Sequence, residues 1–408
     1  MNIQKNKSYF QLENINFFSV TLALYAICCS MALNHGDTTL GSSTVHLIFV
    51  ASKNLFLLCS LLAFFRMPKS FSITGFLLLT SIVLLDVLSG YTNTMLIYLG
   101  LILFFFCAPE LKWQCYKVFY AYMVVTGAIG ILCYISFALR LPVPYETVNY
   151  YGEQLAQSLG LFYVDYKICY LTVGFDGIRL CGLFNEPGYY GTIAALFLIS
   201  NKCDFKDKWN IILLLAGILS ISLAFFVLVG GYIIASNFTK IKKLIGISIL
   251  VLFLIIVLTK VGVIPESTIN GFLDRFTYSD GSFNGDNRSN DYLDSEFRRL
   301  FSDTAHFVWG HGNLTKFDFS GVASYKLFMI QFGVVGSILA WSLLLIASLK
   351  ATKMSFHKLL FIGLFFVSIY QRYYVFDIVY ILVLIGGLYN LETKETTISV
   401  ASLREKSK

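Results

Sequence analysis

The chain has 408 residues, of which 57% are hydrophobic and only 13% charged, and its formal net charge is +7. This composition excludes a soluble domain and indicates a protein that crosses a membrane many times. Apolar runs long enough for helices recur between residues 17 and 390, without the alternating, turn-punctuated pattern of an outer-membrane barrel. We therefore expect an all-α bundle of transmembrane helices that forms one integral membrane domain over residues 1–408.

Lysine and arginine fall in alternate loops, and these residue types mark the loops that stay in the cytoplasm. Lys5 and Lys7 precede the first apolar run, the next loop has neither residue type, and the loop after the second run is basic again. Continued along the chain, this alternation predicts about twelve spans with both termini in the cytoplasm. It places two long segments on the outer face, at about residues 140–187 and 264–323.

In chain order, the sequence predicts a first helix at 17–33, further spans up to residue 140, and a short sixth span at 188–200. The stretch 210–236 is long enough for one span, but both of its flanks are basic, so it has to cross an even number of times. Its serines and Gly230-Gly231 indicate a broken pair of short helices or a re-entrant hairpin. The remaining expected spans are 244–263, 324–349, and a short pair broken at 371–373 before a basic tail.

The nine cysteines follow no metal-binding spacing, and most lie in apolar runs where a thiol is a small hydrophobic group. Cys169 and Cys181 share the first outer segment and form a candidate disulfide in an oxidising compartment. The run at 280–287, DGSFNGDN, resembles a calcium loop only faintly because the terminal glutamate is missing. We therefore expect no required metal.

Arginine is concentrated on the outer face. By this topology, seven of the nine arginines lie outside: Arg140, Arg179, Arg275, Arg288, Arg298, Arg299 and Arg372. A planar guanidinium binds phosphate oxygens through paired hydrogen bonds, which lysine cannot do. Ion pairs within an amphipathic helix explain Arg298 and Arg299, whereas charges as close to apolar runs as Arg179 and Arg372 indicate a site. Arg275 and Arg288 lie in a loop rich in Gly, Asn, Asp and Ser that could surround a hydrophilic ligand.

The stretch GIRLCGLFNEPGYYG, residues 177–191, leads from the first outer segment into the short sixth span. Pro187 suits the first position of a helix, and Glu186 then stands at its cap. The amides of Tyr189 and Tyr190 would be free and face outward, which favours an anion beside the arginine of this motif. The alternative is that Glu186 only caps the helix and pairs with Arg179.

His311 lies between Gly310 and Gly312 in the second outer segment. A histidine with an ordinary pKa of about 6.5 can act as a general base, although a single histidine is more often a surface residue. The six tyrosines of the first outer segment suit packing on sugar rings, although tyrosine is also common at membrane interfaces.

Short motifs in the two outer segments resemble those of the bacterial O-antigen polymerases, the Wzy family. The first motif has the pattern R-x-x-G-x-F-x-E-P, and the second outer segment carries an Asp-Arg pair, a G-x-G and a following helix with two glycines. The matching residues are Arg179, Gly182, Phe184, Glu186 and Pro187, then Asp274-Arg275, Gly310 and Gly312, and finally Gly333 and Gly336.

This resemblance implies a GT-C-like glycosyltransferase of the bacterial inner membrane that acts on the periplasmic face without a cofactor or metal. Its donor and acceptor would be oligosaccharides linked to undecaprenyl pyrophosphate in the membrane lipid, with a chain-length regulator protein as a candidate partner and no nucleic acid. Arg179 and Arg288 would bind the pyrophosphate, and Glu186 or His311 would be the base. Further substrate contacts would come from Asn185, Asp274, Arg275 and Arg372.

Two other functions remain open at this stage. The related O-antigen ligases, which transfer glycan to lipid A-core, often carry a His-Asn or His-Ser pair where this chain has Ala323-Ser324-Tyr325. A lipid-linked oligosaccharide flippase should gather charge near the membrane midplane, and here such charges are few: Lys53, Asp86, Lys260 and Asp377.

Overall fold

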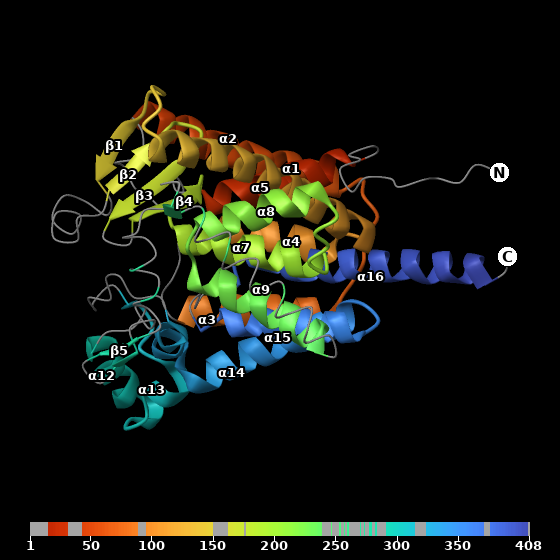
Figure 1. Cartoon of the computed structure of the whole chain (residues 1–408). Coiled ribbons are helices and arrows are strands. Elements are labelled where there is room, and N and C mark those ends of the chain that lie inside the picture. Colours follow the sequence, from red (N-terminus) through yellow and green to blue (C-terminus); the bar gives the residue numbers. More distant parts are fainter. Residues whose placement is uncertain are drawn as a thin grey trace.

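The structure is a computed structural model, which describes most of the chain. The described residues are 15–31, 43–88, 95–149, 162–174, 177–238, 291–314, 324–370 and 376–406, with isolated positions at 246, 253, 257, 259–260, 270, 273, 277–279 and 282–283. Helices pack side by side in a bundle with a small sheet at one end, and the C-terminal helix extends beyond the opposite end (Figure 1). We call these the sheet end and the distal end.

The described part of the chain contains three helices that are long and apolar enough to cross a membrane. They are α2 (Ser43–Phe64), α5 (Pro109–Ala138) and α14 (Tyr325–Ala351). Shorter apolar helices accompany them: α1 (Phe17–Ser30), α3 (Ile73–Leu88), α4 (Met95–Phe106), α7 (Pro187–Ser200), α8 (Lys208–Leu219), α9 (Leu223–Ser236) and α15 (Phe356–Ser368). The predicted helical membrane protein is confirmed. The total of about twelve spans stays a prediction, because most of 244–263 lies outside the described residues.

The uncharged helix α7 lies at the centre of the bundle. It packs against α8, α9, α15 and α16 (Ile378–Lys406), and its Phe197 ring lies 5.4 Å from that of Phe119 on α5. Tyr189 is the only residue of α7 that is not buried. A helix that is apolar on every side belongs in a core, because it has no polar face to present. The first half of α16, from Ile378 to Leu391, is buried in the same way.

The predicted break within 210–236 is confirmed. Helix α8 ends at Leu219, α9 begins at Leu223, and Ile221 between them has a positive φ of 48°. The two helices lie on either side of α7 (Figure 1). Lengths of 12 and 14 residues correspond to about 18 and 21 Å, less than the hydrocarbon thickness of about 30 Å. The pair therefore forms a short hairpin whose tip is at the sheet end.

The first outer segment, expected to be a loop in an all-α protein, contains a four-stranded antiparallel sheet, so the all-α prediction is wrong there. The strands pair in the order β1-β2-β3-β4. Their bounds are Glu146–Asn149, Phe162–Asp165, Tyr170–Gly174 and Gly177–Gly182, and a separate two-residue hairpin joins β5 (Tyr278–Ser279) to β6 (Ser282–Phe283). The strands were missed because they are short, and their tyrosines also suit a membrane interface.

The sheet packs on the end of α5. Leu180 of β4 lies against Gly130, where an added Cβ would come within 2.8 Å of the leucine. The candidate disulfide is not formed: Cys169 and Cys181 are both free, and the Cys181 thiol donates to the hydroxyl of Thr172 (3.8 Å). Burial against α5 therefore holds the sheet in place.

Two C-terminal expectations have different outcomes. The break between the last two helices falls between Ser368 of α15 and Ile378 of α16, although residues 371–375 themselves lie outside the described part. The tail expected after residue 390 instead continues α16 to Lys406.

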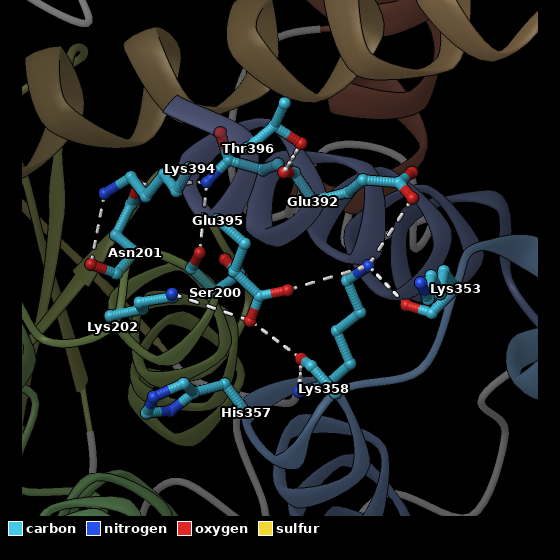
Figure 2. A network of polar contacts seen from close by, with 12 residues as sticks. Ser200, Asn201, Lys202, Lys353, His357, Lys358, Glu392, Lys394, Glu395 and Thr396 are labelled. Carbon is cyan, nitrogen blue, oxygen red and sulfur yellow. Dashed lines mark hydrogen bonds and ion pairs between the residues drawn. The ribbon is translucent and has the colours of Figure 1, made fainter. Parts of the chain in front are cut away.

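At the distal end, hydrogen bonds join the end of α7 to α16 and α5. The Asn390 side-chain amide donates to the carbonyl oxygen of Ser200 (3.0 Å) and to Oδ1 of Asn201 (3.1 Å). Lys394 Nζ donates to the Asn201 carbonyl (3.1 Å), and the Tyr116 hydroxyl bonds the Ser200 hydroxyl (2.6 Å), as Figure 2 shows in part. The final carbonyls of a helix lack hydrogen-bond donors within the helix. Here the buried side chains of Asn390 and Lys394 donate these bonds.

An ionic cluster extends this contact to α15 (Figure 2). Glu395 accepts from the Ser355 hydroxyl (2.7 Å) and lies 3.5 Å from Lys202 Nζ and 3.9 Å from Lys358 Nζ. Lys358 is almost completely buried and also lies 3.7 Å from Glu392. Hydrogen bonds and ion pairs thus connect both the start of α15 and the end of α7 to α16.

We predict that Asn390→Leu destabilises the protein, because it removes the hydrogen bonds of Asn390 to the Ser200 carbonyl and from Trp113 Nε1 of α5 (3.3 Å). Each unsatisfied buried group costs about 1–3 kcal/mol. Thr393→Ala is the matched control, since Thr393 is exposed and its hydroxyl donates to the carbonyl oxygen of Tyr389 on its own helix. Thermal unfolding in detergent would measure both variants. Equal midpoints for the two would contradict the structural role of Asn390.

Candidate functional site

Arg179 lies on β4 where the strand passes the tip of the α8–α9 hairpin. Because Leu180 faces α5 and neighbouring side chains of a strand point to opposite sides, Arg179 points away from α5. Its Nε donates to the carbonyl oxygen of Ser220 (3.2 Å) and its Nη2 to that of Ile221 (3.3 Å). The guanidinium therefore satisfies carbonyls that the end of α8 exposes. This anchoring role was not predicted from the sequence.

Glu186 and Pro187 occupy the positions that the sequence predicts. Pro187 begins α7, and Glu186 is its N-cap residue, without a side-chain capping hydrogen bond. The prediction of free amides at Tyr189 and Tyr190 is wrong, because both donate to the carbonyl oxygen of Glu186 (3.2 and 3.3 Å). Of the alternative in which Glu186 caps α7 and pairs with Arg179, the side-chain cap is therefore not observed. The pairing with Arg179 stays a prediction.

The turn that precedes α7 is fixed by backbone contacts. The Tyr163 hydroxyl of β2 donates to the carbonyl oxygen of Asn185 (2.5 Å), and Phe184 pairs with Met31 at the end of α1. The half-buried Glu186 follows directly. The sheet thus fixes the position of the backbone that carries the Glu186 side chain.

His311 belongs to a second corner, built by α12 (Asp291–Leu300), α13 (Thr304–Trp309) and the start of α14. Helix α14 is interrupted at Gly333, whose φ of 76° and ψ of 162° are not helical. The carbonyls of Ile330 and Gln331, which an unbroken helix would bond internally, accept instead from the backbone N–H groups of His311 (2.7 Å) and Gly312 (3.0 Å). The G-x-G segment therefore completes the hydrogen bonding of a broken helix.

Gly310 and Gly333 are required by the approach of these two segments. A Cβ on Gly310 would lie 2.3 Å from the Gln331 carbonyl oxygen, and one on Gly333 would lie 2.3 Å from that of Val308. Gly310 also has a φ of 71° and a ψ of −172°, a region open essentially to glycine alone. Both glycine motifs are visible in the sequence, but the sequence does not indicate that the two segments contact each other.

The environment of the His311 ring favours its neutral form. The ring stacks on that of His306 with 4.0 Å between centroids. Partial burial, and then the neighbouring His306, lower the pKa of His311 below its ordinary value. A neutral imidazole can accept a proton at neutral pH, which is the state a general base needs.

The predicted amphipathic helix over Arg298 and Arg299 is confirmed as α12. Arg299 pairs with Glu296 at 2.9 Å, and Lys326 of α14 pairs with Asp294 at 2.6 Å. The ion-pair expectation is thus confirmed for Arg299 and stays a prediction for Arg298.

Both corners contact the start of α16. The rings of Tyr189 and Tyr380 lie 5.5 Å apart, and those of Phe328 and Phe376 are also 5.5 Å apart. The corner with Arg179, Asn185 and Glu186 and the corner with His311 are therefore neighbours at the sheet end. The other predicted site residues lie outside the described residues: Asp274, Arg275, Arg288 and Arg372.

Comparison with known proteins identifies no relative. No family model, curated protein or solved structure matches this chain. The contacts described above are thus the basis on which a function can be proposed.

We predict that Gly310→Ala and Gly333→Ala each destabilise the protein by at least about 2 kcal/mol, because each forces an unfavourable backbone and a steric clash. Gly363→Ala on α15 is the control, since a Cβ there meets no atom within 4 Å and alanine favours a helix. Thermal unfolding distinguishes them. Tolerance of alanine at position 310 would contradict the docking of this segment on α14.

A second prediction concerns pH. Because folding lowers the pKa of His311 from 6.5, the folded protein binds this proton less readily than the unfolded chain does. The stability contribution is complete above pH 6.5 and is lost as the pH falls through the lower folded value. His311→Phe should therefore reduce the fall in unfolding temperature between about pH 7 and pH 5. An unchanged pH dependence in this variant would contradict the burial of the ring.

Proposed function

We propose that this protein is an O-antigen polymerase of the bacterial inner membrane. It joins oligosaccharide repeat units linked to undecaprenyl pyrophosphate, in lipopolysaccharide biosynthesis. The observation that carries this proposal is the convergence of the two motif-bearing corners on the start of α16 at the sheet end. A transfer between two lipid-linked glycans needs a group for the leaving pyrophosphate and a base for the attacking hydroxyl, and the corners supply candidates for both.

In the proposed reaction, a hydroxyl oxygen of the acceptor glycan attacks the anomeric carbon of the donor sugar. The bond from that carbon to the pyrophosphate oxygen breaks, and undecaprenyl pyrophosphate leaves with the electron pair. Arginines in a site that excludes water stabilise this developing charge by several kcal/mol. Arg179 takes this role, with two of its N–H groups fixed on the hairpin tip so that the guanidinium is held in one orientation. Arg288 is the second arginine of the proposal.

The hydroxyl proton goes to Glu186 or His311. Glu186 stands at the N-terminus of α7, where its side chain makes no capping hydrogen bond. The lowered pKa of His311 keeps its imidazole ready to accept a proton. Asn185, Asp274, Arg275 and Arg372 are assigned to substrate binding.

Two alternatives make different demands. An O-antigen ligase would use the same donor but transfer to lipid A-core. A flippase would need charges along a path through the bundle. One of the few candidate charges, Asp377, instead caps α16, where its carboxylate accepts from the N–H of Val379 (3.1 Å).

The proposal predicts the lipopolysaccharide of a strain that lacks this gene. A single repeat unit on the lipid core is expected on a gel, because ligation and flipping remain intact. Loss of every repeat would indicate a ligase or a flippase instead. An unchanged ladder would exclude all three functions.

We also predict that Arg179→Lys lowers turnover of a lipid-linked repeat in reconstituted vesicles by about 10²-fold, because lysine cannot hold pyrophosphate through two hydrogen bonds. Arg299→Lys is the control, since Arg299 is itself exposed and the variant keeps a cation beside Glu296. Thermal unfolding is measured for both. Unchanged turnover, or a loss of turnover matched by a loss of stability, would indicate that Arg179 only anchors the hairpin and does not bind pyrophosphate.

A further inference from the structure

A cavity of about 640 Å³ opens at the distal end, between the first turn of α5, the end of α14 and α16. Cavities of several hundred Å³ accommodate small molecules or lipid headgroups. Its lining residues on α16, Tyr389, Glu392 and Thr393, lie toward the distal end of that helix, away from its start, which the two corners contact. A ligand here would therefore be distinct from the substrates of the proposed function.

The walls carry charges of both signs. Lys350 and Lys353 come from the end of α14 and the loop after it, Glu110 from the first turn of α5, and Glu392 from α16. Buried Lys358 lies 3.7 Å from Glu392 and donates to the carbonyl oxygen of Lys353 (2.6 Å), which fixes this wall (Figure 2). With Glu392 facing Lys358, two lysines and one glutamate remain to recognise a ligand.

Thr352 also lines this cavity. Its Oγ1 atom is buried and has no hydrogen-bond partner in the described structure. A buried polar atom without a partner is costly, by about 1–3 kcal/mol. A ligand with an acceptor oxygen between the two lysines would supply the missing bond.

The position of the cavity indicates that the ligand is a lipid. Helices α5 and α14 are both long enough to cross a membrane, and both have an end at this cavity. Trp113 and Tyr389 also line it, and these residue types concentrate at the level of lipid headgroups. An occupant of this site therefore lies where phosphate and amine groups of phospholipids are most concentrated.

We propose that this cavity binds the phosphoethanolamine headgroup of a membrane phospholipid, with the phosphate at Lys350, Lys353 and Thr352 and the ammonium group at Glu110. The phosphate accepts hydrogen bonds from the lysines and the hydroxyl. The ammonium group donates to the carboxylate. An acidic headgroup without an amine leaves Glu110 facing a second negative charge.

Binding can be measured with the full-length protein in detergent, to which phosphatidylethanolamine is added while bound lipid is followed by native mass spectrometry. The double variant Lys350→Gln, Lys353→Gln should weaken binding roughly 10- to 30-fold in total, since each lysine near a lipid phosphate contributes roughly a five-fold factor in affinity. Lys206→Gln is the control, an exposed lysine at the same end but outside the cavity. Unfolding temperatures without lipid verify that each variant folds.

Lipid identity provides the second test. Phosphatidylglycerol should bind the wild type more weakly than phosphatidylethanolamine, and Glu110→Gln should remove this preference. Equal binding of the two lipids by the wild type, or full retention by the double lysine variant, would overturn the proposal. Free phosphoethanolamine bound as tightly as the lipid would instead assign the site to a soluble phosphate compound, and would also overturn it.

Discussion

The constraint on which this structure depends is that an apolar environment offers no partner for a backbone N–H or C=O group, so every interruption of a helix has to be satisfied by the protein itself. Three interruptions are resolved in three ways. Arg179 bonds the carbonyls at the tip of the α8–α9 hairpin. The backbone of His311 and Gly312 bonds those released by the kink of α14. At the end of α7, Asn390 and Lys394 perform the same task from α16.

This constraint gives the candidate site residues a double role. Arg179 was singled out for its chemistry, and the structure shows it joining β4 to the hairpin. His311 was singled out for its ring, while its backbone N–H closes the contact with α14. A side chain that already has a structural anchor is held in one orientation, and preorganised charges are the more effective in stabilising a transition state. The two roles are therefore compatible, and measurements of activity have to be accompanied by measurements of stability.

Composition and periodicity predicted much of the fold. Uncharged runs marked α7, basic flanks forced the break between α8 and α9, and the acids and arginines of α12 identified an amphipathic helix. The sheet was not predicted, because strands of four to six residues carry little periodic signal and their aromatic residues suit a membrane interface equally well. The position of Pro187 and Glu186 followed from local rules of helix capping. The contact between Gly310 and Gly333 depends on tertiary packing, which no local rule contains.

The length of α8 has a consequence for the surrounding lipid. Ile211 and Leu215 expose about two fifths of their surface on a helix of 12 residues, so the hydrophobic face turned outward is about 18 Å long. A bilayer with a core of about 30 Å can match a face this short by thinning locally around the hairpin. Headgroups of the two leaflets are then drawn toward each other beside α8. The protein thus shapes the membrane next to its own centre as well as being held by it.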